Sequence, residues 1–118
     1  MDSNCNFPRQ RKVYLSKALK QSGDTKKRPV VVVSIDIRNQ YSSTVLVVPF
    51  SSDLSQAANP SRTLIKQEEG GLKIDLVAMC DVLTCIRKQY LEPESYGTIS
   101  SESFKRILQA IQIAIGIY

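Results

Sequence analysis

Two apolar runs on either side of one short polar segment limit the fold of this chain more than any other feature. Val30 to Ile35 and Thr44 to Phe50 are both rich in β-branched residues. Asp36 to Ser43 lies between them, is rich in Asn, Gln and Ser, and is interpreted as a turn. Continuous apolar runs of this length are typical of strands buried on both faces. Pro49 cannot donate to a sheet ladder, so pairing should stop or shift at that position.

The rest of the chain up to residue 97 predicts further short strands and polar connections. Strands are predicted at 12–15, 62–67 and 74–80, and residues 82–86 continue the last one after a break near Asp81. Loops or turns are predicted at 16–27, 51–60, 68–71 and 87–97, where Gly, Pro and polar residues gather.

The C-terminal segment predicts an amphipathic helix. Ser100 or Ser101 can cap its start, and Gly116 suits its end. Its apolar positions follow helical spacing and should pack on the sheet: Phe104, Ile107, Leu108, Ile111 and Ile115. The additional Ile113 and Ile117 widen this face, for the core or for a subunit interface.

Length and element order together predict one small domain. The chain has 118 residues, enough for a single modest core. Residues 1–10 are interpreted as a polar lead-in and 11–118 as the domain. About five to seven short strands and one terminal helix indicate a mainly β protein with α, built as a small closed or half-closed barrel.

The net charge of +5 is concentrated in the first third of the chain. Residues 1–40 hold nine Lys or Arg against three acids, whereas residues 41–118 hold seven against eight. A basic half on a near-neutral domain favours a polyanionic partner, although a solvated surface without a partner would have the same composition. The lysines expected to attract phosphates without sequence preference are Lys17, Lys20, Lys26 and Lys27.

Several kinds of site are excluded by composition. The chain has no histidine, so it cannot form a Ser-His-Asp triad, a Cys-His pair or a paired-histidine nuclease site. It has neither a phosphate-binding P-loop nor a dinucleotide fingerprint. An odd number of cysteines, three, argues against a disulfide framework. A zinc site would lack histidine ligands, so no metal or cofactor is expected. Without an apolar leader or membrane-length apolar run, the protein is expected in the cytoplasm.

One reaction suits the side chains that remain, namely RNA cleavage without a metal. The ribose 2′-hydroxyl is an internal nucleophile, so the protein need only orient the backbone and stabilise charge on the phosphate. Arg28 offers a planar fork for phosphate oxygens, and the Ser51 hydroxyl can donate to the same group. The two residues are symmetric about the turn and would meet at one end of a hairpin. Tyr14 and Tyr41 are candidates for stacking on bases.

The order of these segments resembles the MazF/PemK toxins of bacterial toxin–antitoxin modules. The similarity covers residues 11 to 117 and is carried by RPVVVVS-x-D, TVLVVPFSS, GLKIDLVAMCDVLTCIRKQYL and SSESFKRILQAIQIAIGI. It implies an SH3-like barrel with a C-terminal helix, a fold shared with the gyrase-poisoning CcdB toxins. It also implies a homodimer, a cognate antitoxin, and metal-independent cleavage of single-stranded RNA at short sequences to a 2′,3′-cyclic phosphate.

The resemblance also implies roles for individual residues. The family's essential arginine falls on Arg28, and its essential threonine or serine falls on Ser51, with Ser52 beside it. An acidic residue proposed as the base in some members falls on Asp81.

This chain departs from the family at several positions. Arg11-Lys12 stands where many members have Gly-Asp, and Met79, Val82 and Thr84 replace polar or basic residues near the acidic position. Two alternatives therefore stay open: a non-enzymatic gyrase poison of the CcdB type, and a catalytically weakened RNA-binding relative.

Overall fold

The structure, a computed structural model, describes residues 6–17 and 26–116. Within them, strands and helices follow in the order β1 (Lys12–Ser16), β2 (Arg28–Val32), α1 (Asp36–Tyr41), β3 (Thr44–Ser51), β4 (Thr63–Ile65), β5 (Leu76–Ala78), β6 (Thr84–Arg87), β7 (Leu91–Thr98) and α2 (Ser101–Ile115). Single 3₁₀ turns, η2 to η5, lie at Leu54–Ala58, Glu69–Gly71, Cys80–Val82 and Lys88–Tyr90. None of the helices in this described part is long and apolar enough to cross a membrane.

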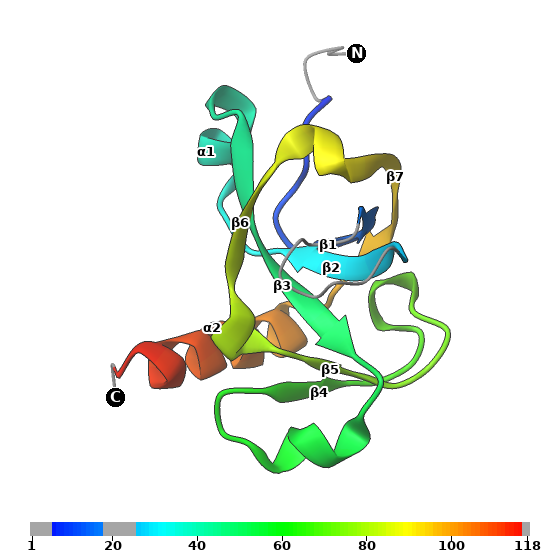
Figure 1. The fold of residues 1–118 in the computed structure, drawn as a ribbon, viewed down its shortest axis with the longest axis vertical. Helices are drawn as coiled ribbons and strands as arrows, with labels where there is room; N and C mark the ends of the chain where they lie inside the picture. Colours follow the sequence, from blue (N-terminus) through cyan, green and yellow to red (C-terminus); the bar gives the residue numbers. More distant parts are fainter. Residues whose placement is uncertain (1–5, 18–25, 117–118) are drawn as a thin grey trace.

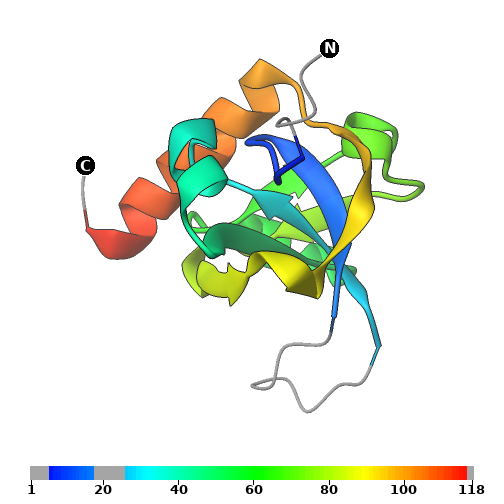
Figure 2. The same ribbon diagram turned by 90° about the horizontal axis from the view of Figure 1, so that it is seen from above.

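The strands form one curled antiparallel sheet, a half-barrel, with α2 along one side (Figures 1 and 2). The strand order is β4-β5-β3-β2-β1-β7, and β6 also pairs with β3. On one edge β3 pairs with β2 from Val47 to Pro49, whereas on the other it pairs first with β6 through Val47 and then with β5 from Phe50. The change of partner falls at Pro49, as the sequence predicts. This α+β half-barrel with a C-terminal helix confirms the predicted fold class.

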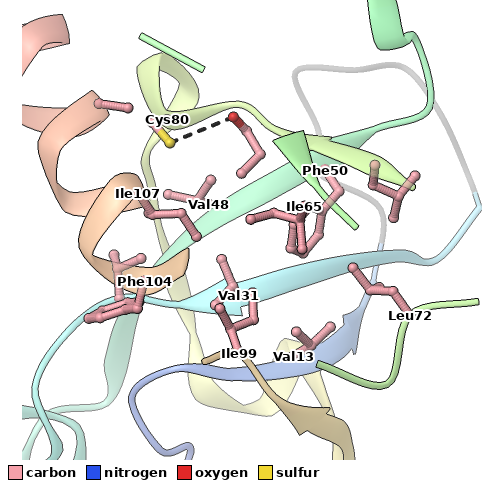
Figure 3. Packing of buried hydrophobic residues seen from close by; sticks show 14 residues of the cluster. Val13, Val31, Val48, Phe50, Ile65, Leu72, Cys80, Ile99, Phe104 and Ile107 are labelled. Carbon is pink, nitrogen blue, oxygen red and sulfur yellow. Dashed lines mark hydrogen bonds between the residues drawn. The ribbon is translucent and has the colours of Figure 1, made fainter. Parts of the chain in front are cut away.

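The two central strands are buried on both faces, which confirms the interpretation of their apolar runs except at the end of the first, because β2 ends at Val32 and Ile35 is exposed. Because successive side chains point to opposite faces of a strand, Val31 and Val48 enter one core cluster and Val30 and Val47 enter another. The first cluster lies between the sheet and α2, where Phe104 and Ile107 meet these valines (Figure 3). Because both faces of β2 and β3 pack into a core, a shift in their pairing would move every side chain to the wrong cluster, and the hairpin keeps a single register.

Helix α2 begins and ends where the sequence predicts. The Ser100 hydroxyl accepts a hydrogen bond from the Ser103 backbone N–H at 3.2 Å, and Gly116 ends the helix at a φ of 89°. Phe104, Ile107 and Ala110 are buried and Ile111 is partly buried, whereas Leu108, Ile113 and Ile115 are exposed, so the predicted packing of Leu108 and Ile115 is wrong. Ile117 lies outside the described residues. The apolar face that packs on the sheet is therefore narrower than predicted and ends near Ile111.

The segment predicted as a plain turn contains helix α1, so that prediction is wrong. The buried Asn39 explains the difference, because its side-chain amide donates to the Ser34 carbonyl at 2.8 Å. The Ser34 hydroxyl donates to Asn39 Oδ1 at 2.5 Å and accepts from the Leu46 N–H at 3.0 Å. The buried polar groups of Ser34 and Asn39 thus find hydrogen-bond partners within this helical connection.

The segment predicted as a connection at 87–97 is mostly strand β7, so that prediction is also wrong. Pro93 and Gly97 are unusual in strands, but β7 lies at the edge of the sheet. Its pairing with β1 shifts register between Val13 and Tyr14 and again before Ser16. These irregularities accommodate residues that a central strand would exclude.

Smaller differences concern the strands near Asp81 and the cysteines. The strand predicted at 74–80 covers only Leu76–Ala78, and its continuation begins at Thr84. Cys80 is buried, as expected for a small apolar residue, but Cys85 is exposed and Cys5 lies outside the described residues.

Candidate functional site

An open groove of about 650 Å³ lies at the end of the sheet where β2 begins and β3 ends. Its walls come from β2, the end of β3, the connection between β4 and β5, and β7. Figure 1 shows this connection beside the start of β2. The lining residues are Arg28, Pro29, Phe50, Ser52, Gly71, Leu72, Lys73, Ile74, Leu76 and Tyr96.

The strand register brings two of the predicted site residues to the same end of the hairpin. Val30 lies opposite Pro49, and continuing that register places Arg28 opposite Ser51. Arg28 is exposed and lines the groove together with Ser52. Ser51 is half-buried, and its hydroxyl accepts a hydrogen bond from the Asp53 backbone N–H at 3.1 Å. That bond leaves the Ser51 hydroxyl proton available to a ligand.

Two of the predicted phosphate-attracting lysines, Lys17 and Lys27, lie at the same end of the sheet as Arg28. Ser16 pairs with Arg28, so Lys17 and Lys27 lie just beyond that pair. The Lys17 ammonium lies 5.9 Å from the centre of the Tyr90 ring, and Lys27 forms an ion pair with Glu92. Lys26 is exposed, and Lys20 lies outside the described residues. Part of the local positive charge is thus already balanced within the protein.

Asp81 lies in η4 and is not among the described residues that line the groove. Arg62 binds its carboxylate through two nitrogens, with Nε–Oδ1 at 2.8 Å and Nη2–Oδ2 at 3.2 Å. Such a bidentate pair fixes the carboxylate. The catalytic role implied for Asp81 stays a prediction, and the structure does not bring this side chain into the groove with Arg28 and Ser52.

Glu69 joins the groove wall to helix α2. Its carboxylate accepts hydrogen bonds from the Ser100 N–H at 2.9 Å, the Ser100 hydroxyl at 3.1 Å and the Ser103 hydroxyl at 2.5 Å. Burial raises the pKa of the Glu69 carboxyl, but these hydrogen bonds and the positive charge of Arg106 together lower the pKa below its usual 4.5. The turn that precedes Gly71 is therefore fixed to the helix N-terminus.

Of the lining residues, sequence reasoning predicted only Arg28 and Ser52 as site residues, and it missed the others, including Lys73, Ile74 and Tyr96. Tyr96 lies in the segment interpreted as a connection, and no local pattern marks it as part of a site. Of the two tyrosines suggested for stacking, Tyr14 is buried in the second core cluster, whereas Tyr41 is 78% exposed on α1 and does not line the groove.

The fold and site together define a small α+β domain with an arginine- and serine-bearing groove at one end of its half-barrel. A family model described as "PemK-like, MazF-like toxin of type II toxin-antitoxin system" matches residues 9–115. The chain therefore belongs to the PemK/MazF family of toxins, which confirms the resemblance.

Individual relatives agree with this assignment. The chain is 29% identical over 91 residues to a protein named Endoribonuclease MazF from Staphylococcus saprophyticus, covering 77% of this chain and 75% of that protein. Among solved structures, MazF from Deinococcus radiodurans has a TM-score of 0.78 at 14% identity, covering 94% of this chain and 98% of its own. A mycobacterial endoribonuclease in complex with its cognate antitoxin has a TM-score of 0.76 at 18% identity, covering 94% and 97%. At these identities the two structures support the fold alone.

Proposed function

We propose that this chain is an endoribonuclease toxin that cuts single-stranded RNA at short sequences. Family membership and the relative named as an endoribonuclease support the activity. The observation that carries the proposal here is a groove that is lined by Arg28, Ser52 and Lys73, with no acids among its described lining, at the end of the β2–β3 hairpin next to Ser51. A phosphodiester is a ligand that such donors recognise.

The proposed reaction uses the nucleophile that RNA itself contains. The ribose 2′-oxygen attacks the adjacent phosphorus, a 2′-O–P bond forms, and the P–O5′ bond breaks. The products are a 2′,3′-cyclic phosphate and a free 5′-hydroxyl, because the 2′-hydroxyl loses its proton and the leaving oxygen gains one. No metal is needed to generate the nucleophile, because the ribose already positions it.

Arg28 and Ser51 have distinct roles in this proposal. The Arg28 guanidinium binds the oxygens of the scissile phosphate and assists proton transfer, and the Ser51 hydroxyl donates a hydrogen bond to the same phosphate. Ser52 and the lysines at positions 17, 20, 26 and 27 bind the flanking RNA backbone. Those backbone contacts should make binding salt-dependent.

The partners proposed for this chain follow from its family. Related solved structures include MazE–MazF of Deinococcus radiodurans and a mycobacterial endoribonuclease in complex with its cognate antitoxin. We infer that this chain likewise has a cognate antitoxin, acts as a homodimer and works in the cytoplasm.

The test is a cleavage assay on a long single-stranded RNA in EDTA, with the new 5′ ends mapped. The wild-type protein should cut at discrete sites. Arg28→Ala should lose at least about 10²-fold in rate, and Ser51→Ala about 10²-fold, because each removes a donor to the transition state. Arg87→Ala, an exposed arginine on β6, is the matched control and should cut normally. Thermal unfolding of all variants checks the fold.

Three results would contradict the proposal. Unchanged cleavage by Arg28→Ala would show that Arg28 takes no part in the reaction. Intact RNA together with a stable complex with the gyrase A subunit would support the CcdB-type alternative. Salt-sensitive RNA binding without any cut would identify a catalytically inactive relative.

A further inference from the structure

We propose that the groove beyond Arg28 holds one unpaired RNA base stacked on Tyr96, and that this contact helps select the nucleotide that flanks the cut. The inference rests on the proposed function and deepens it by assigning a base-binding subsite. Tyr96 and Lys73 are its principal residues, and both line the same groove as Arg28.

The floor and the rim of the groove differ in polarity in a way that suits a nucleotide. Phe50, Leu72 and Leu76 line it while remaining 4–7% exposed, so they present apolar surface from the core below. Arg28, Ser52 and Lys73 supply the polar lining and are exposed. A flat base covers apolar surface favourably, whereas its phosphate needs cationic and hydroxyl donors. One groove therefore offers a place for each part of the same nucleotide.

Tyr96 is exposed, but its backbone is fixed. The residue is 49% exposed, which leaves an area that a base can cover. A Cβ added to Gly71 would lie 2.1 Å from the Tyr96 carbonyl oxygen, and one added to Gly97 would lie 2.8 Å from the Gly70 carbonyl carbon. Gly70 and Gly71 also adopt positive φ values of 61° and 77°, which favour glycine. The two backbone segments are therefore in close contact, and Tyr96 lines the groove together with Lys73 and Ile74.

The positive charge beside Lys73 suits a polyanion, and the aromatic ring of Tyr96 next to it favours a nucleic acid. Lys73 forms no ion pair within the described part of the chain, and the groove-lining residues there include no Asp or Glu. Lys73 can therefore bind the phosphate next to the stacked base. An aromatic ring beside cations is the usual arrangement for binding single-stranded RNA, because every base can stack.

The experiment compares wild type with Tyr96→Ala, Tyr96→Phe and Tyr41→Ala on short RNAs that contain one mapped cleavage site. Each RNA is made intact and with an abasic nucleotide on either side of the cut. Tyr96→Ala should lower kcat/KM on the intact RNA by about 5-fold to 100-fold, the loss expected for one base–aromatic stack. Tyr96→Phe keeps the ring and should stay within about 2-fold. Tyr41→Ala, on an exposed tyrosine outside the groove, should cut normally.

The abasic RNAs separate stacking from a general loss of structure. Removing the stacked base should slow wild type about as much as Tyr96→Ala does, and Tyr96→Ala should lose nothing further on that RNA. If Tyr96→Ala cuts the intact RNA as fast as wild type, or if its loss persists unchanged on both abasic RNAs, the subsite is wrong.

A binding measurement keeps this inference separate from the cleavage proposal. A set of RNAs with 2′-O-methyl groups throughout and 2-aminopurine at one position cannot be cut, and stacking quenches the 2-aminopurine fluorescence. Quenching by wild type and Tyr96→Phe but not by Tyr96→Ala would support the subsite even if no RNA were cleaved. Cleavage by wild type with equal quenching by Tyr96→Ala would overturn the subsite and leave the proposed function standing. If Tyr96→Ala weakened only binding of an antitoxin peptide, the groove would be a protein-binding site and the inference would fail.

Discussion

Arg62 binds both carboxylate oxygens of Asp81 and connects three separate segments of the chain. Besides its two contacts to Asp81, its Nη1 donates to Gln56 Oε1 at 3.1 Å. The side chains of Arg62 and Asp81 are 16% and 34% exposed, so water screens the pair only in part. The arrangement ties η2 and η4 to the residue that precedes β4, and it gives Asp81 a structural role.

Asp81→Asn should therefore affect stability more than catalysis. We expect the free energy of unfolding to fall by about 1 kcal/mol, and RNA cleavage to stay within about 3-fold of wild type. Denaturant unfolding and the cleavage assay measure the two effects. Arg62→Met removes the same ion pair and serves as the comparison. A loss of 10²-fold or more in rate without a change in stability would instead identify Asp81 as the general base.

Glu69 should make the stability of the protein depend on acid pH. Its folded-state pKa lies below the usual 4.5, so its contribution is present above that value and is lost as the pH falls through the folded pKa. Glu69→Gln should lower the free energy of unfolding by about 1 kcal/mol at pH 7. The difference between the two proteins should shrink below pH 4.5. A constant difference from pH 7 to pH 3 would show that Glu69 acts by packing alone.

Gly71 and Gly116 form a matched pair for testing the contact that positions Tyr96. Both have positive φ, at 77° and 89°, but a Cβ on Gly116 would meet nothing within 4 Å. Gly116→Ala should therefore cost about 1 kcal/mol from backbone strain. Gly71→Ala adds a clash with the Tyr96 backbone and should cost about 3 kcal/mol. Equal midpoints in urea for the two variants would show that the Gly71–Tyr96 contact relaxes easily.

The two described cysteines should differ in reactivity. Burial, followed by the negative charge of Asp81, raises the pKa of the Cys80 thiol to about 12, and that residue is 1% exposed. Its Sγ also donates to the Ala78 carbonyl at 3.6 Å. Iodoacetamide at pH 8 should label Cys85 in the folded protein and reach Cys80 only after unfolding, because the thiolate is the nucleophile. Peptide mapping by mass spectrometry distinguishes the sites. Equal labelling in the folded state would contradict the packing around η4.

Patterns confined to neighbouring residues determined much of this protein from sequence alone. The β-branched runs specified strands buried on both faces. Successive side chains of a strand point to opposite faces, so a continuous apolar run makes both faces apolar. The antiparallel pairing of the two runs followed, and it places Arg28 and Ser51 at the same end of the hairpin. Ser100 and Gly116 marked the ends of α2, because capping depends on the few residues at each terminus.

Contacts between distant segments were decided only by the tertiary structure. Residues 36–41 form a helix where a turn is predicted because the buried Asn39 bonds to Ser34, whose hydroxyl also accepts a hydrogen bond from the Leu46 N–H on β3. Residues 91–98 pair as a strand because β1 lies beside them, despite Pro93 and Gly97. Tyr96 joins Arg28 in one groove through the packing of Gly71, which is 25 residues away in the sequence. Such placements depend on which surfaces meet once the sheet has curled, and no local spacing in a chain encodes that meeting.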